Sequence, residues 1–154
     1  MVTSAALQEL QAFRSELYDC CIRRRDALFE LVDALLTADQ TLADLGDAIP
    51  LAFGFDDPHL WSFFLSGKPW DRTSEYAFLA DDPFGDPKQA AHDLPIPQAP
   101  ADKEFLFLFD YGDEWHFGVK LTGTGQPTRP GARYPRLVAT HGDAPPQYPD
   151  MDEE

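Results

Sequence analysis

Carboxylate side chains form the tightest group of chemically useful residues in this sequence. Asp110, Asp113 and Glu114 surround a Gly-Asp break at residues 112–113. Carboxylates this close together could bind a divalent cation, or one could have its pKa raised for acid–base work. Turn chemistry explains the same cluster, because Asp side chains accept local backbone N–H bonds and Gly112 can supply a positive φ. We favour the turn, since acidic residues are common at turns.

Histidine is the second residue type that could do chemistry here. A zinc site would need three histidines, or two with a carboxylate, in one place. No two of the four histidines have helical i, i+4 or tight-turn spacing. His59 and His116 are the best pair, because neighbouring strands could present both on one face of a sheet. A lone His on a sheet is more often a hydrogen-bonded structural residue.

Aromatic side chains could instead line a ligand pocket or a partner groove, although most should be core. Trp70 lies in a Gly-Lys-Pro-Trp turn and Tyr148 lies between prolines, so both are poor core residues and better contact residues. Nucleophile motifs of the G-x-S-x-G type are absent, and Gly123-Thr-Gly125 lacks the lysine of a phosphate loop. The aromatic candidates for ligand or partner contact are Trp61, Trp70, Tyr111, Trp115 and Tyr148.

Residues 105–121 must position most of these side chains. Phenylalanine alternates with leucine over residues 105–109, and apolar alternates with more polar residues over 115–121. Two period-two segments around a short turn predict a β-hairpin. The first arm is apolar on both faces, as a buried central strand should be. We expect the rest of the chain to cover this hairpin.

Helices are expected before the hairpin. Residues 4–38 contain no Gly or Pro and place leucines at helical spacing, which predicts an N-terminal helical extension. A second helix is predicted over residues 41–52, with Leu42, Leu45, Ile49 and Phe53 facing inward. Short strands are predicted at residues 59–65, 73–79 and 134–141. The proline-rich residues 80–102 read as a connecting loop, with a helical turn near residues 87–92 and a lid as the alternative role.

The whole chain, residues 1–154, fits one domain with a substantial core, since 44% of it is hydrophobic and 13% aromatic. The expected fold is α+β, with a mainly antiparallel sheet centred on the 105–121 hairpin and N-terminal helices packed on one side. Residues 150–154 form an acidic tail.

Charge and cysteine content restrict the partners and the compartment. A net charge of −15 argues against nucleic acid binding, which needs a basic surface. The basic residues 23–25 are therefore read as a solvated helix face, with an anion contact as the alternative. Neighbouring Cys20 and Cys21 suit a reducing compartment. With no signal peptide and no run of membrane-spanning length, we expect a soluble cytoplasmic protein without membrane contact.

Three separated motifs resemble the plasmid Ri ORF-3-like domain family, also known as the TnpR passenger protein of an insertion element. The family pattern Y-D-F-G-D-x-W-x-H-x-I-x-L is similar to residues 109–121. Its L-x-D-L-H-x-x-I-Q and G-[WF]-x-x-x-H-L-x-x-F patterns are similar to residues 42–50 and 54–63. A late Y-P and x-P-P are similar to Tyr134-Pro135 and Pro145-Pro146. The resemblance covers residues 41–150 and implies an α+β fold with a mainly antiparallel sheet and no established chemistry.

Several polar positions of the family pattern differ in this chain. The His and Gln of L-H-x-x-I-Q are Gly46 and Pro50, and the His after the Trp is Phe117. The acidic pair after the double proline is Gln147-Tyr148. If those polar residues formed an active centre in relatives, this chain has lost most of it. The family also usually begins with a strand, where this chain is predicted to begin with helix.

These observations favour a non-catalytic module that binds a protein or a small ligand, with no cofactor. The alternative is a metal-assisted, hydrolase-like site that uses His59, His116, Asp110 and Asp113 with a divalent metal. A third reading, an accessory protein linked to mobile elements, follows from the resemblance alone.

Overall fold

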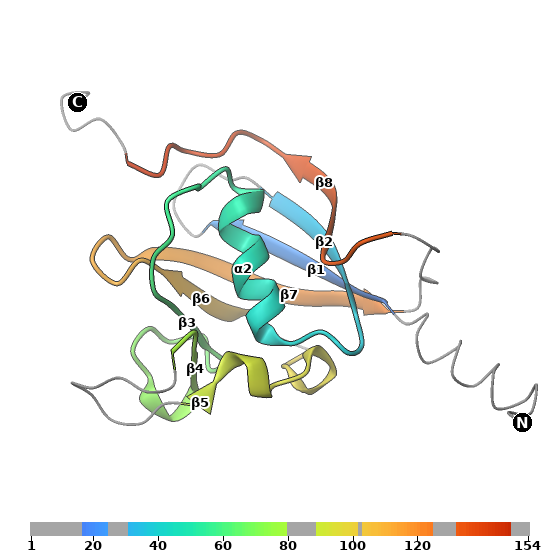
Figure 1. The fold of residues 1–154 in the computed structure, drawn as a ribbon, viewed down its shortest axis with the longest axis horizontal. Coiled ribbons are helices and arrows are strands. Elements are labelled where there is room, and N and C mark those ends of the chain that lie inside the picture. Colours follow the sequence, from blue (N-terminus) through green and yellow to red (C-terminus); the bar gives the residue numbers. More distant parts are fainter. Residues whose placement is uncertain (1–16, 25–30, 80–88, 102, 125–131, 149–154) are drawn as a thin grey trace, which may run out of the picture.

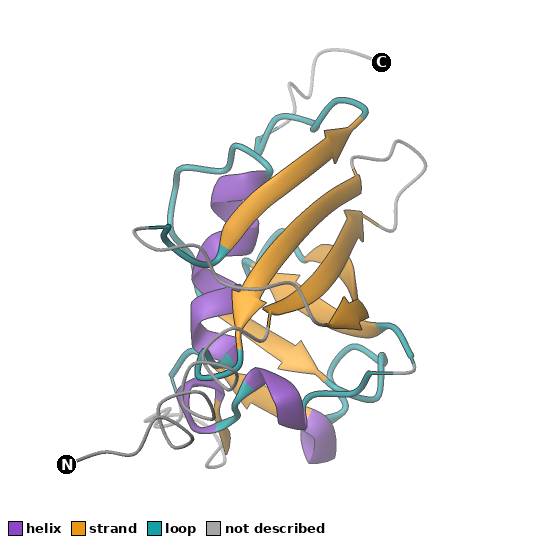
Figure 2. Ribbon diagram, turned by 90° about the vertical axis from the view of Figure 1, so that its right-hand side faces the viewer, coloured by secondary structure: helices purple, strands orange, loops and turns teal. Residues whose placement is uncertain are grey.

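A mixed sheet with one α-helix on one of its faces forms the structure (Figures 1 and 2), a computed structural model that describes residues 17–24, 31–79, 89–101, 103–124 and 132–148. Within these residues the sheet has eight strands in the order β5-β4-β3-β6-β7-β1-β2-β8. Neighbouring strands are antiparallel, apart from the parallel pair β4 and β5. The expected α+β class with a mainly antiparallel sheet is confirmed.

The regular elements of the described chain are eight strands, one α-helix and three 3₁₀ turns. The strands are β1 (Leu17–Arg24), β2 (Leu31–Thr37), β3 (Trp61–Phe64), β4 (Glu75–Ala77), β5 (Gln89–Ala90), β6 (Phe105–Phe109), β7 (Trp115–Thr124) and β8 (Arg136–His141). The helix is α2 (Leu42–Ala52), and the 3₁₀ turns are η1 (Arg72–Ser74), η2 (Ala91–Asp93) and η3 (Ile96–Gln98).

Strands β6 and β7 form the predicted hairpin, with Phe107 opposite Phe117. All five residues of β6 are buried, as the apolar pattern on both of its faces requires. Side chains alternate across a strand, so the phenylalanines of β6 face α2 and join the large core cluster. Leu106 and Leu108 face the other way and pack with Phe64. The hairpin therefore separates two apolar layers.

Helix α2 lies across the sheet on the side of the large core cluster (Figure 2). The Thr41 hydroxyl accepts the Ala43 N–H, and the Asp44 carboxylate accepts the Thr41 N–H, which completes a capping box. Leu42, Leu45 and Ile49 are fully buried. The prediction for residues 41–52 is confirmed, including its buried face.

The predicted N-terminal helix is wrong where the structure describes it, because residues 17–24 and 31–37 form strands β1 and β2. Apolar runs this short carry no period that separates helix from strand. Pairing decides the outcome, since β1 completes the sheet between β7 and β2 and places Ile22 opposite Val119. The first element that the structure describes is therefore a strand, β1. Residues 4–16 and 25–30, like the acidic tail, lie outside the described residues.

The stretch read as a connecting loop is part of the core over residues 89–101. Ile96 is fully buried, its N–H bonds to the Gln40 carbonyl, and the Leu94 carbonyl accepts the Leu42 N–H. Local pattern missed this because the burial comes from contacts with α2, distant in sequence. The helical turn predicted near residues 87–92 is shifted, because residues 89–90 form β5 and the 3₁₀ turn η2 spans Ala91–Asp93. Residues 80–88 lie outside the described part.

The remaining strands are shorter than predicted. Strand β3 starts at Trp61, so His59 precedes it and does not open it. The 73–79 prediction begins instead in a 3₁₀ turn and becomes strand only at Glu75. Strand β8 starts at Arg136, directly after the cis Tyr134–Pro135 bond. Within the described residues, no helix has the length and apolar character needed to cross a membrane.

Candidate functional site

The predicted site residues divide between the two faces of the sheet. Trp61 and Trp115 lie on the face covered by α2, and both belong to the large core cluster. On the same face, the His59 ring makes a T-shaped contact with Phe109, with 5.7 Å between ring centroids. On the opposite face, Trp70 packs on Phe64. The site residues on that second face are Trp70, Tyr111, Glu114 and His116.

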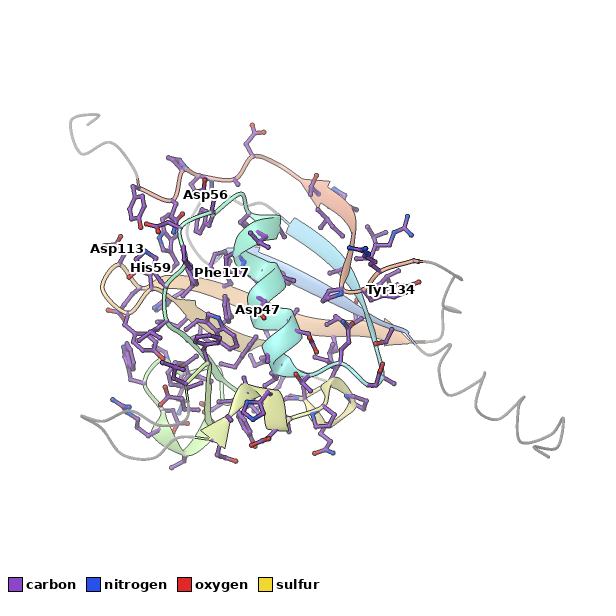
Figure 3. The ribbon with its side chains drawn as sticks, viewed as in Figure 1. Asp47, Asp56, His59, Asp113, Phe117 and Tyr134 are labelled. Carbon is purple, nitrogen blue, oxygen red and sulfur yellow. The ribbon has the colours of Figure 1, made fainter. Side chains whose placement is uncertain are left out.

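His59 is the centre of a polar cluster on the helix side. Its Nε2 lies 2.6 Å from the Tyr148 hydroxyl, 3.4 Å from Asp110 Oδ2 and 3.6 Å from Asp57 Oδ2. The Tyr148 hydroxyl donates to Asp57. Because the hydrogen of this hydroxyl already points at Asp57, its oxygen can only accept from His59. The His59 Nε2 atom therefore carries a hydrogen. Figure 3 shows His59 at the hairpin-turn end of the sheet, near Asp113 and far from Tyr134.

Asp110 serves both the turn and the cluster. Its Oδ1 accepts the backbone N–H groups of Gly112 and Asp113, as the turn interpretation predicts. Its Oδ2 faces His59. The positive φ angles of this turn are at Asp110 (65°) and Glu114 (51°), whereas the prediction gave that role to Gly112, which is not among the positive-φ glycines.

The phenol of Tyr148 is held in its neutral form. Its hydrogen bond to Asp57, helped by burial and by the charges of Asp57, Asp110 and Asp113, raises the pKa of Tyr148 to about 12. The side chain is 52% exposed, so solvent screens these charges. Tyr148 is thus a hydrogen-bond donor at neutral pH and not a base or a nucleophile.

A strap of residues 142–148 carries Tyr148 back to the loop before β3. Gln147 is buried and bonds the Asp57 backbone twice, accepting its N–H at 3.2 Å and donating to its carbonyl at 2.8 Å. Gln147 and Tyr148, which are neighbours in the strap, therefore both form hydrogen bonds to Asp57. In Figure 1 this segment runs along the upper edge of the molecule toward the hairpin turn.

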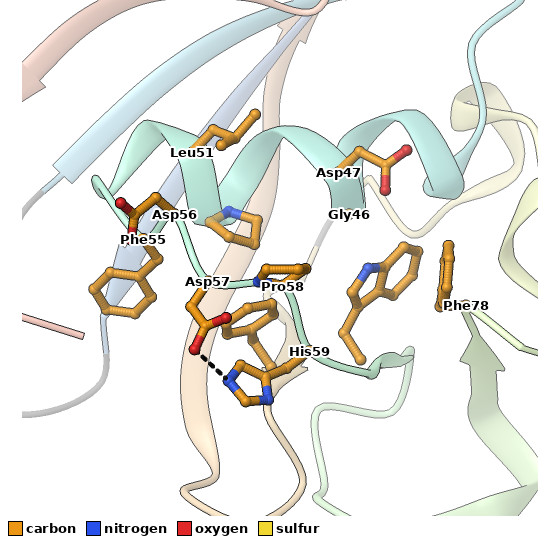
Figure 4. Close-up of a pocket in the computed structure, with 12 residues that line it drawn as sticks. Gly46, Asp47, Leu51, Phe55, Asp56, Asp57, Pro58, His59 and Phe78 are labelled. Atoms are coloured by element: carbon orange, nitrogen blue, oxygen red, sulfur yellow. Dashed lines mark ion pairs between the residues drawn. The ribbon is translucent and has the colours of Figure 1, made fainter. Parts of the chain in front are cut away.

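Beside the cluster, a pocket of about 290 Å³ opens between α2 and the loop before β3 (Figure 4). Its walls are mostly apolar and include Phe55, Trp61, Phe78 and Phe109. The remaining lining residues are Gly46, Asp47, Pro50, Leu51, Asp56, Asp57, Pro58 and His59. Phe78 and Leu51 are 47% and 70% exposed, so apolar surface is available at the mouth.

The charge of this pocket is negative. Three aspartates line it, and of its twelve lining residues only His59 could carry a positive charge. Partial burial, with the neighbouring Asp44 adding repulsion, raises the pKa of Asp47. An apolar pocket with a carboxylate rim suits a ligand that has an apolar body and a cationic end.

On the opposite face the polar groups are paired with one another. The Ser62 hydroxyl donates to buried Glu75 at 2.6 Å and lies 2.7 Å from the Tyr111 hydroxyl. The Trp70 indole N–H donates to Glu114 at 2.9 Å. The backbone of Trp70 has a positive φ of 63°. This network closes the face over Phe64.

The predicted pair of His59 and His116 does not form. His116 alternates with Trp115 and Phe117, which face α2, so it lies on the face opposite Phe109 and His59. Its Nε2 lies 3.8 Å from Glu114. Among the residues that the structure describes, no three His, Cys, Asp or Glu side chains are grouped to hold a metal ion.

Positions where the chain departs from the family pattern gather at the pocket. Gly46 and Pro50 line it, and Phe117 packs behind Phe55 at 6.1 Å between centroids. Gln147 and Tyr148 hold its Asp57. A Cβ added to Gly46 would lie 2.4 Å from the Trp61 ring, so the indole fills the space that a side chain at position 46 would need.

The sequence argument missed several site residues. Asp56 and Asp57 were not among the candidates, and Gln147 was noted only as a departure from the family pattern. An acidic pair that precedes a His within three residues was the one available signal. Gln147 is 90 positions from Asp57, so only the fold could bring the two together.

The fold and this pocket define a small α+β protein with a ligand-sized cavity on its helix side. The chain belongs to the plasmid pRiA4b ORF-3-like protein family, whose model matches residues 33–150.

Two similar proteins carry no stated function. An uncharacterized protein, y4hQ, from Sinorhizobium fredii is 28% identical over 110 residues, which is 69% of this chain and 52% of the relative. The chain thus spans about half the length of that protein. The crystal structure of MM3350, a protein of unknown function from Methanosarcina mazei, is similar with a TM-score of 0.69 and 21% identity, over 87% of this chain and 74% of that one. This second likeness establishes the fold alone.

Proposed function

We propose that the chain is a non-catalytic binding module whose pocket takes a ligand with an apolar body and a positively charged end. The observation that supports this is the pocket of about 290 Å³ whose aromatic walls lie beside three aspartates. An ammonium or guanidinium group would meet the carboxylates at the rim while its apolar portion packs on Trp61 and Phe78. A cytoplasmic location is part of this proposal.

The chemistry of the lining favours binding over turnover. The twelve lining residues include no serine, threonine, cysteine or lysine that could act as a nucleophile. The raised pKa of Tyr148, about 12, removes the phenolate as a base at neutral pH. His59 directs its Nε2 at Tyr148 and two carboxylates of the protein itself. These interactions position the loop at residues 56–59.

Three probes that share a phenylethyl body test the charge preference. Phenethylamine, 2-phenylethanol and 3-phenylpropionate would be titrated into the ¹⁵N-labelled full chain and followed by NMR. We expect the amine to bind most tightly, the alcohol more weakly and the carboxylate weakest, with amide shifts at residues 46–61. Equal binding of all three, or shifts elsewhere in the molecule, would contradict the proposal.

A matched pair of charge variants locates the effect. Asp56→Asn should weaken amine binding by about two- to fivefold, the range of one exposed ion pair, and leave alcohol binding unchanged. Asp39→Asn removes the same charge from an exposed position that does not line the pocket. If both variants weaken amine binding equally, the attraction comes from the net charge of −15 and not from the pocket.

A further inference from the structure

The second feature that could bind a partner is the sheet edge formed by β8. Within the described residues β8 pairs with β2 on one side only, and it ends the strand order. Five of its six residues are exposed, including Leu137 (46%) and Val138 (57%). Proteins usually protect such an edge with lysine, proline, a β-bulge or a short strand. Strand β8 contains neither lysine nor proline, and its ladder with β2 has one register shift, at Val138. The opposite edge is protected because its strand, β5, is only two residues long.

An apolar groove of about 300 Å³ runs beside this edge, between α2 and the sheet. Leu45, Ala48 and Leu51 line it from the helix, and Ala34, Pro135 and Leu137 from the sheet. Every residue that lines the groove is apolar. It is separate from the aspartate-lined pocket, apart from Leu51, which borders both.

Register fixes which side of an added strand would enter the groove. Leu137 is opposite Ala34, and both line the groove, so its neighbour Arg136, which is opposite Leu35, faces the other side of the sheet. A strand paired with β8 would direct alternate side chains to these two sides. Its groove side should be aliphatic, and its other side should complement Arg136.

The positive charges beside β8 indicate that an acidic segment would bind at this edge. Arg133 and Arg136 are exposed and make no ion pair in the described part of a chain that has 27 acidic and 12 basic residues. A second copy is a poorer fit, because β8 contains no carboxylate that could meet Arg136 in a β8–β8 pair. We propose that β8 and its groove bind an extended acidic segment of a partner protein, which adds a strand to the sheet.

A designed peptide tests this proposal on the full chain. The probe is fluorescein-labelled Leu-Glu-Leu-Glu-Leu-Glu-Leu, with blocked ends, followed by fluorescence anisotropy. We expect saturable binding that weakens with salt. Binding should be lost when a proline replaces a leucine next to the central glutamate of the peptide, because proline lacks the N–H that would donate to the ladder. A lysine version of the peptide should bind at least about fivefold more weakly.

Three protein variants assign the site. Arg136→Glu should weaken the acidic peptide by about five- to tenfold, while Lys103→Glu, an exposed reversal away from β8, should not. Ala48→Phe, which fills the groove from α2, should weaken both peptide versions. Far-UV circular dichroism checks that each variant is folded. Failure of the peptide to bind, equal loss in both charge reversals, or a wild-type dimer that Arg136→Glu dissociates would overturn the proposal.

Discussion

The two faces of the central strands β3, β6 and β7 carry polar groups of different kinds. On the face away from α2, Ser62, Glu75 and Tyr111 bond to one another within the protein. On the helix face, the carboxylates of Asp47 and Asp56 line an open pocket. Paired buried groups stabilise a fold, whereas charges beside an unfilled cavity are available to a ligand. The first face therefore reads as structural, and the second is the face on which we propose that a ligand binds.

Ser62→Ala should have the largest effect on stability and none on binding. It removes the 2.6 Å hydrogen bond to buried Glu75, so we expect a loss of about 2–3 kcal/mol in the free energy of unfolding, measured by urea denaturation. Thr73→Ala, which removes an exposed hydroxyl, should cost less than about 0.5 kcal/mol. A weaker affinity of Ser62→Ala for phenethylamine would show that the two faces are not independent.

Gly46→Ala should damage both stability and binding. The new Cβ meets the Trp61 ring at 2.4 Å, and displacing the indole should cost about 1–2 kcal/mol even after the higher helix propensity of alanine is counted. Because Trp61 is a pocket wall, phenethylamine affinity should fall as well. The double variant with Trp61→Phe makes room for the methyl group and should recover part of the stability. No recovery would locate the strain elsewhere.

Tyr148→Phe should change how the free energy of unfolding depends on pH in the alkaline range. The pKa of Tyr148 is about 12 in the folded chain against an ordinary 10.0, so the neutral phenol stabilises the fold below pH 10, and this contribution is lost as the pH rises from 10 to 12. Absorbance at the tyrosinate band should show a phase near pH 12 in the wild type. That phase should be missing in Tyr148→Phe, and its persistence would assign it to another tyrosine.

Asp47→Asn should have the smallest effect, with opposite signs for stability and binding. Since the fold raises the pKa of Asp47, its ionised form slightly destabilises the protein above that pKa, and the penalty disappears as the pH falls. The variant should therefore melt slightly higher at pH 7 and the same at acidic pH, while it binds phenethylamine more weakly. A variant that melts lower would mean that Asp47 has a stabilising partner.

Much of the central architecture could be predicted from local pattern. Strict alternation in residues 105–109 and 115–121 predicted the hairpin, and the leucine spacing with Thr41 predicted α2 and its buried face. His59, Asp110 and Tyr148, which the sequence suggested for different kinds of site, lie together in the structure. Their partners could not be predicted, because Asp57 and Gln147 contribute through backbone and side-chain contacts that join distant segments.

The sequence by itself determined what depends on near neighbours: the periods of the hairpin and of α2, the capping box and the acidic charge. Tertiary structure decided the rest. Residues 17–24 and 31–37 became strands because β7 offered them a ladder, although their apolar spacing equally suited a helix. The faces of His59 and His116 were likewise set by strand order and register. Alternation makes adjacent positions diverge to opposite sides of a sheet, and only the complete sheet shows which side holds the pocket.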